Sequence, residues 1–159
     1  VVIDDDRCAS RGMAALLDSM PEFRCLDVRA DVPGRDQAPD EVDGVALAVP
    51  KLRELPARIA AARRAFPAAR VLVVGELCSV LSTEAALRCG AAGYVAKEDP
   101  VAIWRAALAS LRGSAHWICP EVAQLVYARR ARPETSYRLA PREREVLALV
   151  GRGRSTRTI

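Results

Sequence analysis

Apolar residues recur along this chain with two different periodicities. Short apolar or alternating runs, typical of β-strands, occur at residues 1–4, 23–28, 45–49, 71–75 and 93–97. Between them, apolar residues recur every three or four positions over 7–20, 52–66, 82–90 and 100–112, which is typical of helices packed on one face. Strands that alternate with helices predict βαβ units, and therefore an α/β fold with a five-stranded, doubly wound parallel sheet of flavodoxin-like order.

Turn-forming and capping residues set the limits of these elements. Proline and glycine within residues 29–44 predict a loop with at most one helical turn. Ser82 or Thr83 is expected to cap the helix over 82–90, and Gly90 is expected to stop it.

The carboxyl ends of the predicted strands carry the candidate chemistry. In doubly wound sheets, ligands bind beyond these ends. Asp4 and Asp5 follow the first strand, Gly75 ends the fourth and Lys97 ends the fifth, while Ala46 is expected at the end of the third. We therefore expect these side chains to lie close together.

The chain changes character after the last predicted strand and helix. We divide it into a domain over 1–113, a linker over 114–137, and the start of a further helical domain over 138–159. The linker is expected to contain a helix over 120–132, with Pro120 in its first turn. The net charge is +4 in total, and residues 120–159 alone carry nine Arg and four Glu, so the basic charge is concentrated there. A near-neutral N-terminal part and a basic segment over 120–159 suggest a regulatory module joined to a module that binds a polyanion.

Other features narrow the class of protein. The five cysteines form no C-x-x-C pair, so we expect reduced thiols rather than a disulfide framework or a zinc site. No apolar run reaches the roughly 20 residues that a membrane span needs, and we expect a cytoplasmic protein. Neither a glycine-rich phosphate loop nor a nucleophile elbow is present, so we do not expect an enzyme.

Three segments carry a resemblance to a known family. "VVIDDDRCASRGMAALLDS" (1–19) and "GAAGYVAKEDP" (90–100) resemble the first and fifth strand regions of the receiver domain of bacterial response regulators. "LAPREREVLALVGRGRSTRTI" (139–159) resembles the start of a LuxR-type helix-turn-helix. Together they are similar to the NarL/FixJ subfamily, which implies a transcriptional regulator that binds double-stranded promoter DNA as a homodimer.

The resemblance also implies a phosphorylation site. In the family, an acidic pair and a phosphoacceptor aspartate hold Mg²⁺, and a lysine helps to neutralise the phosphoryl group. Asp4 and Asp5 match the acidic pair and Lys97 matches the lysine. Tyr94 matches the aromatic position that swings inward when a Ser or Thr on the fourth strand contacts the phosphate.

Two positions depart from the family pattern. Counting back four residues from Pro50 places Ala46 at the phosphoacceptor, and Gly75 stands at the Ser/Thr position. A methyl group cannot accept a phosphoryl group, and glycine has no side chain to bind one. We therefore predict an atypical, pseudo-receiver domain that is independent of phosphorylation. It is expected to have no cognate histidine kinase, weak Mg²⁺ binding, and no cofactor.

Two interpretations of the remaining residues stay open. In the first, an Asp5–Lys97 salt bridge only stabilises the sheet at the carboxyl ends of its strands. Alternatively, the small residues Ala46 and Gly75 could leave a polar hollow for a small-molecule effector, so that activity is set either by a ligand or by abundance. By analogy, an effector would fit a regulator of antibiotic biosynthesis.

Two further sets of residues are assigned to assembly and to DNA. Trp104, Leu108 and Leu111 form an apolar strip predicted to make the dimer interface. Arg142, Arg154 and Arg157 are expected to contact DNA phosphates rather than to read bases, because the sequence reaches Ile159 before the helix that would enter the major groove. We expect either a truncated DNA-binding domain or a disordered remainder.

Two other classes of function compete with this interpretation. An RNA-binding antiterminator can also be built from a pseudo-receiver followed by helices. An enzyme on a doubly wound sheet is a third class, although the single histidine, His116, has no Ser or Cys partner nearby in the sequence.

Overall fold

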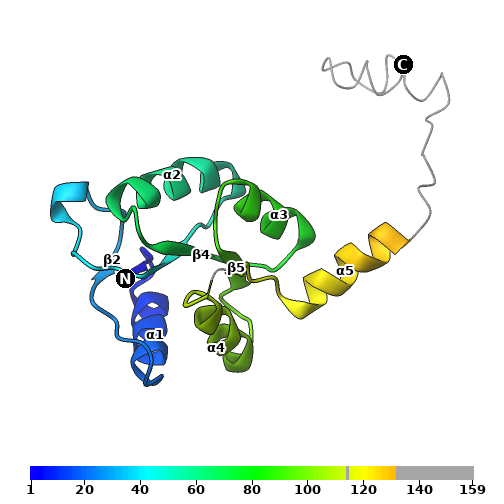
Figure 1. The fold of residues 1–159 in the computed structure, drawn as a ribbon, viewed down its shortest axis with the longest axis horizontal. Helices are drawn as coiled ribbons and strands as arrows, with labels where there is room; N and C mark the ends of the chain where they lie inside the picture. The colour runs from blue at the N-terminus through cyan, green and yellow to red at the C-terminus, as the bar shows by residue number, and fades with distance from the viewer. Residues whose placement is uncertain (114, 132–159) are drawn as a thin grey trace, which may run out of the picture. The chain divides into compact units, whose positions relative to one another are not determined.

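The computed structural model describes residues 1–113 and 115–131. Five strands form one parallel sheet in this part of the chain, and its order is β2-β1-β3-β4-β5. Their bounds are β1 (Val2–Ile3), β2 (Val28–Arg29), β3 (Gly44–Ala48), β4 (Arg70–Gly75) and β5 (Gly93–Ala96). The sheet confirms the predicted doubly wound, flavodoxin-like fold (Figure 1).

Helices cover both faces of the sheet. Their bounds are α1 (Arg7–Asp18), α2 (Leu55–Ala65), α3 (Val80–Arg88), α4 (Val101–Ser110) and α5 (Pro120–Ala131), with short 3₁₀ turns η1 (Arg35–Gln37) and η2 (Leu52–Glu54). In Figure 1, α2 and α3 lie on one side of the sheet and α1 and α4 on the other. The single turn η1 agrees with the loop predicted for residues 29–44.

Strand alternation divides the core into two layers. Leu47 and Val73 face the side of α2 and α3, while Ala48 and Val74 face the side of α1 and α4. Because both faces are covered, nearly every side chain of β1, β3, β4 and β5 is buried, and these four strands carry no charged residue except Arg70 at the start of β4. The consequence is that polar side chains gather at the strand ends, where the chain leaves the sheet.

The second strand is shorter and later than predicted. Residues 23–28 alternate as a strand would, but pairing with β1 begins only at Val28, which lies opposite Val2. The backbone N–H of Cys25 donates instead to the Asp18 carboxylate at 2.7 Å, and Phe23 packs against the core. In this segment, a side-chain carboxylate therefore accepts the backbone hydrogen bond that a neighbouring strand would otherwise accept.

The structure shows one helix cap that was not predicted and one that differs from the prediction. Asp6, which had no assigned role, caps α1, and its carboxylate accepts hydrogen bonds from the N–H groups of Cys8 and Ala9. Ser79 caps α3 by accepting from the N–H of Ser82, so the helix begins at Val80, two residues before Ser82. The predicted stop is confirmed, since Gly90 has a φ of 89°, a backbone conformation that favours glycine.

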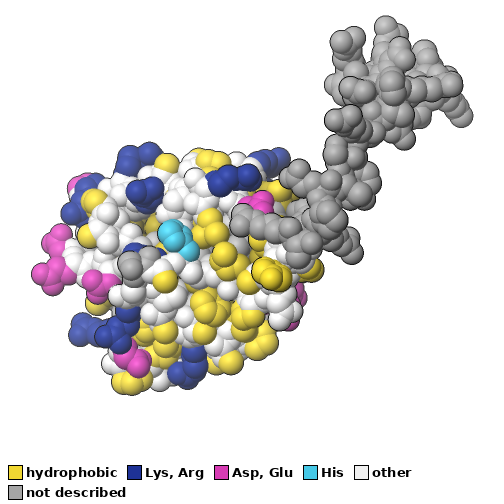
Figure 2. Space-filling model, turned by 45° about the vertical axis from the view of Figure 1, so that its right-hand side comes forward, with side chains coloured by type: hydrophobic (Ala, Val, Ile, Leu, Met, Phe, Trp, Pro, Cys, Tyr) yellow, Lys and Arg dark blue, Asp and Glu magenta, His cyan; other side chains and the backbone are white. Residues whose placement is uncertain are grey.

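The strip assigned to dimerisation belongs to the core of the domain. Trp104, Leu108 and Leu111 are all buried, and they pack in the layer shared by α1 and α4. The assignment of these three residues to a dimer interface is therefore wrong. Exposed large hydrophobic side chains lie elsewhere: Leu77, Leu81, Val101, Leu125 and Tyr127. Figure 2 shows hydrophobic side chains gathered over one part of the displayed face.

The helix predicted over 120–132 is confirmed as α5, which begins at Pro120. By contacts, the chain divides into a unit Val1–Tyr127 and a unit Ala128–Ile159. The residues assigned to DNA contacts, Arg142, Arg154 and Arg157, lie outside the described residues, and so does the helix-turn-helix predicted from 138 onward. Within the described part, no helix is long and apolar enough to span a bilayer.

Candidate functional site

The carboxyl ends of β1, β4 and β5 meet at one edge of the sheet. Asp4 directly follows β1, Gly75 ends β4 and Lys97 directly follows β5. The N–H of Lys97 donates to the carbonyl of Gly75 at 2.8 Å, which carries the pairing one residue beyond the strand. The predicted gathering of Asp4, Gly75 and Lys97 is therefore confirmed.

Lys97 is held between two carboxylates. Its Nζ lies 3.0 Å from Oδ2 of Asp4 and 3.4 Å from Oε1 of Glu76. Nζ also donates to Oδ1 of Asp4 at 3.4 Å. The Asp4 carboxylate is fully buried, whereas Glu76 is exposed, so Asp4 is the partner that most needs the ammonium charge.

The expected Asp5–Lys97 salt bridge is wrong. Asp5 is exposed, and no ion pair of Asp5 occurs among residues 1–113 and 115–131. The physical reason is the turn after β1: Oδ1 of Asp4 accepts the N–H of Asp6 at 3.0 Å, which fixes Asp4 inward while the chain turns into α1. Glu76 directly follows β4 and lies at the same strand end, where the sequence places it, but the sequence had given it no role.

The ionisation of Lys97 follows from these contacts. Burial lowers the pKa of Lys97, but the hydrogen bond and charge of Asp4, with the charge of Glu76 added, outweigh it, and the pKa is raised overall. Lys97 is therefore an ammonium at neutral pH. Its charge is already matched by carboxylates of the protein itself.

Asp6 has a separate, structural role. The backbone N–H groups of Ala9 and Cys8 donate to its carboxylate and lower its pKa. The helix dipole also favours a negatively charged side chain at the N-terminus of a helix. The three successive aspartates thus have three environments: Asp4 is buried and paired, Asp5 is exposed, and Asp6 caps α1.

The structure corrects the position expected for Ala46. Ala46 lies opposite Val2 on β1 and Leu72 on β4, in the middle of β3. It lines a cavity of about 480 Å³ together with Gly44 and Arg70, which begin β3 and β4, so it faces away from the site. Counting back from Pro50 failed because the chain reaches the proline only two residues after β3 ends.

Ala48 takes the place that was assigned to Ala46. Ala48 is the last residue of β3 and pairs with Val74 of β4. Since Ile3 lies opposite Leu47, continuing the register by one residue puts Ala48 beside Asp4. The end of β3 therefore offers a methyl group to the site and no carboxylate.

Gly75 and Tyr94 share one space. A Cβ built on Gly75 would overlap the phenol oxygen and the ring of Tyr94, so the side of β4 next to the site is filled by the tyrosine. Tyr94 is 5% exposed, and its hydroxyl donates to the carbonyl of Leu77 at 2.9 Å. Burial raises the pKa of Tyr94, so the phenol is neutral. The hollow expected beside Gly75 is thus occupied by the protein itself.

A Mg²⁺ ion implied by the resemblance does not fit these residues. Mg²⁺ needs several oxygen ligands in near-octahedral geometry. Ala48 provides none, and the buried carboxylate of Asp4 already contacts the Lys97 ammonium. Asp5 and Glu76 are exposed, but Glu76 already contacts the Lys97 ammonium, and the one remaining carboxylate does not make a magnesium site.

The comparisons with known proteins agree on the fold. No protein-family model and no curated protein matches the chain. Among solved structures, the chain is similar to a two-component response regulator of the LuxR family from Aurantimonas sp. SI85-9A1. The two are 21% identical with a TM-score of 0.65, and the likeness covers 81% of this chain and 94% of that one.

Two further structures extend this likeness. One holds two RcsB dimers bound to two parallel DNAs; it is 20% identical with a TM-score of 0.69, over 97% of this chain and 76% of that one. The other is the signal receiver domain of the putative response regulator NarL from Mycobacterium tuberculosis, with 23% identity and a TM-score of 0.53, over 70% of this chain and 94% of that one. At such identities the likeness shows the fold, which is that of a response-regulator receiver domain.

Proposed function

We propose that this protein is a transcriptional regulator whose receiver-like domain works without phosphorylation and which binds promoter DNA as a dimer. One observation carries the proposal. The residue at the end of β3, beside Asp4, is Ala48, which has no atom that could accept a phosphoryl group. The domain is in this sense a pseudo-receiver, and it needs no partner kinase.

The surrounding residues support the same conclusion. The Lys97 ammonium is matched by Asp4 and Glu76, so no positive charge remains unpaired at the site to attract a phosphate. Tyr94 is already turned inward and hydrogen-bonded, with Gly75 providing the space. In the family that the sequence resembles, an inward aromatic residue accompanies phosphorylation. We infer that this domain is fixed in one state.

If the receiver-like domain is fixed in one conformation without phosphorylation, the activity of the protein must be controlled in another way. The sequence left two controls open, a small-molecule effector at this site or protein abundance. Because Tyr94 fills the space beside Gly75 and Ala46 faces the other end of the sheet, a ligand at this site has little room. Abundance is the control that we favour.

The assignment to DNA rests on charge and likeness. The basic residues are concentrated after residue 120, as expected of a segment that contacts a nucleic-acid backbone. RcsB, whose fold the chain shares, binds DNA as dimers. We assign Arg142, Arg154 and Arg157 to phosphate contacts and the protein to a non-catalytic role.

Two measurements test the proposal. Incubation with acetyl phosphate and Mg²⁺, followed by intact-mass measurement, is expected to show no phosphoryl adduct, while a response regulator with an intact acceptor serves as the positive control. A stoichiometric adduct would refute the pseudo-receiver. In the second, binding to duplex DNA is expected to be equal with and without acetyl phosphate and to weaken as salt rises. A preference for RNA over duplex DNA would instead favour an antiterminator.

A further inference from the structure

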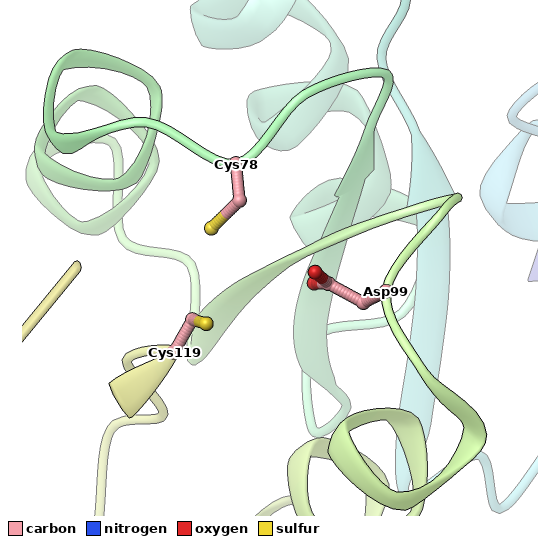
Figure 3. Close-up of side chains that lie close together, drawn as sticks. All are labelled: Cys78, Asp99 and Cys119. Atoms are coloured by element: carbon pink, nitrogen blue, oxygen red, sulfur yellow. The ribbon is translucent and has the colours of Figure 1, made fainter. Parts of the chain in front are cut away.

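Three side chains with metal-binding atoms meet near the start of α5. Cys78 lies in the loop between β4 and α3, Asp99 in the loop between β5 and α4, and Cys119 directly before α5. Their sulfur and carboxylate oxygen atoms all lie within 4.8 Å of one another. Figure 3 shows the three side chains pointing toward a common space from separate segments. None of them takes part in the site around Lys97.

In the described part of the chain, no lysine or arginine forms an ion pair with the donor atoms of this cluster. Cys119 is buried, and Cys78 and Asp99 are partly buried. Among the described residues, Asp99 has no ion pair with any lysine or arginine. A divalent cation would supply the missing charge and hold both sulfurs as thiolates.

We propose that Cys78, Asp99 and Cys119 bind one divalent metal ion of the zinc class, with water as the fourth ligand. Two thiolates and a carboxylate suit Zn²⁺, which prefers tetrahedral sulfur, nitrogen and oxygen donors. With Zn–S near 2.3 Å and Zn–O near 2.0–2.2 Å, tetrahedral ligand atoms lie about 3.5–3.8 Å apart. Since no two donor atoms are more than 4.8 Å apart, each separation has to shorten by at most about 1.0–1.3 Å to reach that spacing. Binding releases the two thiol protons to solvent.

Neighbouring groups already orient two of the ligands. The N–H of Ala96 donates to Oδ2 of Asp99 at 2.8 Å, which fixes the carboxylate and leaves its other oxygen for a metal. The buried hydroxyl of Thr83 has no hydrogen-bond partner in the described part of the chain, and it lies beside Cys78, where it can donate to a thiolate. Such outer hydrogen bonds are typical around metal ligands.

The metal would fasten the beginning of α5 to the domain. The segment before Cys119 already follows the sheet, since the N–H of Trp117 donates to the carbonyl of Ala92 at 2.8 Å and Trp117 forms a bridge with Gly93. A metal ion on Cys119 would add a bond from this segment to the loops after β4 and β5. The inference goes beyond the proposed function and does not depend on it.

A disulfide between Cys78 and Cys119 is the competing chemistry. It would leave Asp99 without a role, whereas a metal uses all three side chains. We therefore favour the metal, and the experiment separates the two.

The test is a titration of the reduced, chelator-treated full chain with Co²⁺. We expect one equivalent to produce a thiolate-to-cobalt charge-transfer band, and one equivalent of Zn²⁺ to abolish it. Cys78→Ser and Cys119→Ser are expected to lose the band, and Asp99→Asn, which can still accept the Ala96 N–H, to bind at least about tenfold more weakly. Cys8→Ser is the matched control, because Cys8 is an exposed cysteine on α1, and it is expected to bind normally.

Several results would overturn the proposal. One is the absence of a charge-transfer band in the wild type, whatever the variants do. Another is an unchanged band in Cys78→Ser or Cys119→Ser, or an unchanged affinity for Co²⁺ in Asp99→Asn. A third is a Cys78–Cys119 disulfide that forms in air in a protein that binds no Co²⁺ when reduced. Circular dichroism of each variant establishes that a lost band reflects a lost ligand in a folded protein.

Discussion

The phenol oxygen of Tyr94 occupies the space that any side chain on residue 75 would need. A Cβ on Gly75 would overlap this oxygen and the adjoining ring carbon. The hydroxyl is in turn held by the carbonyl of Leu77, 2.9 Å away. The glycine and the inward tyrosine therefore require each other, and no comparable constraint acts on Gly12, which has open space around it.

Adding a methyl group at residue 75 is expected to displace Tyr94. Gly75→Ala should destabilise the domain by about 1–3 kcal/mol, the usual cost of overpacking, because the ring must move and its hydrogen bond to Leu77 is lost. Urea unfolding followed by circular dichroism measures the change.

A double-mutant cycle identifies the cause. In a Tyr94→Leu background the cost of Gly75→Ala should fall, because the overlapping phenol is gone. Gly12→Ala, in the exposed part of α1, should instead be neutral or stabilise by up to about 1 kcal/mol. Equal costs of Gly75→Ala in both backgrounds would show that Tyr94 is not the obstacle.

Removing the ammonium group of Lys97 should leave a buried carboxylate unpaired. Lys97→Met is expected to lower the free energy of unfolding by about 3 kcal/mol, because Asp4 is 2% exposed and keeps only the N–H of Asp6 as a partner. Thermal and urea unfolding at neutral pH measure the loss.

The partners of Lys97 should respond unequally. Glu76→Gln is expected to change stability by less than about 0.5 kcal/mol, since Glu76 is exposed. Asp4→Asn combined with Lys97→Met should recover part of the loss, because no buried charge remains. If Glu76→Gln is the more damaging single change, the assignment of Asp4 as the main partner is incorrect.

The cap of α1 gives a prediction about pH. The pKa of Asp6 is lowered from its ordinary value of 3.8, so its charged form contributes stability that is present above pH 3.8 and is lost as the pH falls through the folded-state pKa. Asp6→Asn keeps a capping side chain without the charge. The difference in urea midpoint between wild type and Asp6→Asn should therefore be constant above pH 3.8 and disappear at lower pH. A difference that persists in strong acid would argue against a charge-dependent cap.

The apolar strip on α4 should behave as core. Leu108→Ala is expected to cost about 2–5 kcal/mol, because Leu108 is buried between α4 and the sheet. Val101→Ala, on the exposed start of the same helix, should cost far less. Sedimentation of both variants should show the same oligomeric state as the wild type. If a dimer dissociates in folded Leu108→Ala but not in Val101→Ala, the strip is part of a dimer interface after all.

Periodicity in the sequence was enough to predict the fold. Residues 71–75 and 93–96 carry no charged side chain because strands covered on both faces must be apolar, and residues 7–20 show one apolar face because α1 packs on one side only. These patterns act over a few residues and need no knowledge of distant contacts. The same local logic also predicted the stop at Gly90 and the start of α5 at Pro120.

Positions within the site depended on register, which local patterns do not determine. Ala46 and Ala48 lie on the same face of β3, so alternation alone cannot say which one lies beside Asp4; the pairing of Ile3 with Leu47 decides it. In the same way, the sequence shows three aspartates in a row, but only the turn after β1 makes Asp4 the partner of Lys97.

Contacts between distant segments were decided by the tertiary structure alone. The sequence determined that Asp4, Gly75 and Lys97 lie at or directly after strand ends, and that no carboxylate stands within the third strand, because both depend on residue type and short-range order. It could not determine that Tyr94 fills the space at Gly75, nor that Cys78, Asp99 and Cys119 meet. Those contacts join segments many residues apart, and their geometry follows from how the sheet twists and how the loops pack on it, which no spacing along the chain records.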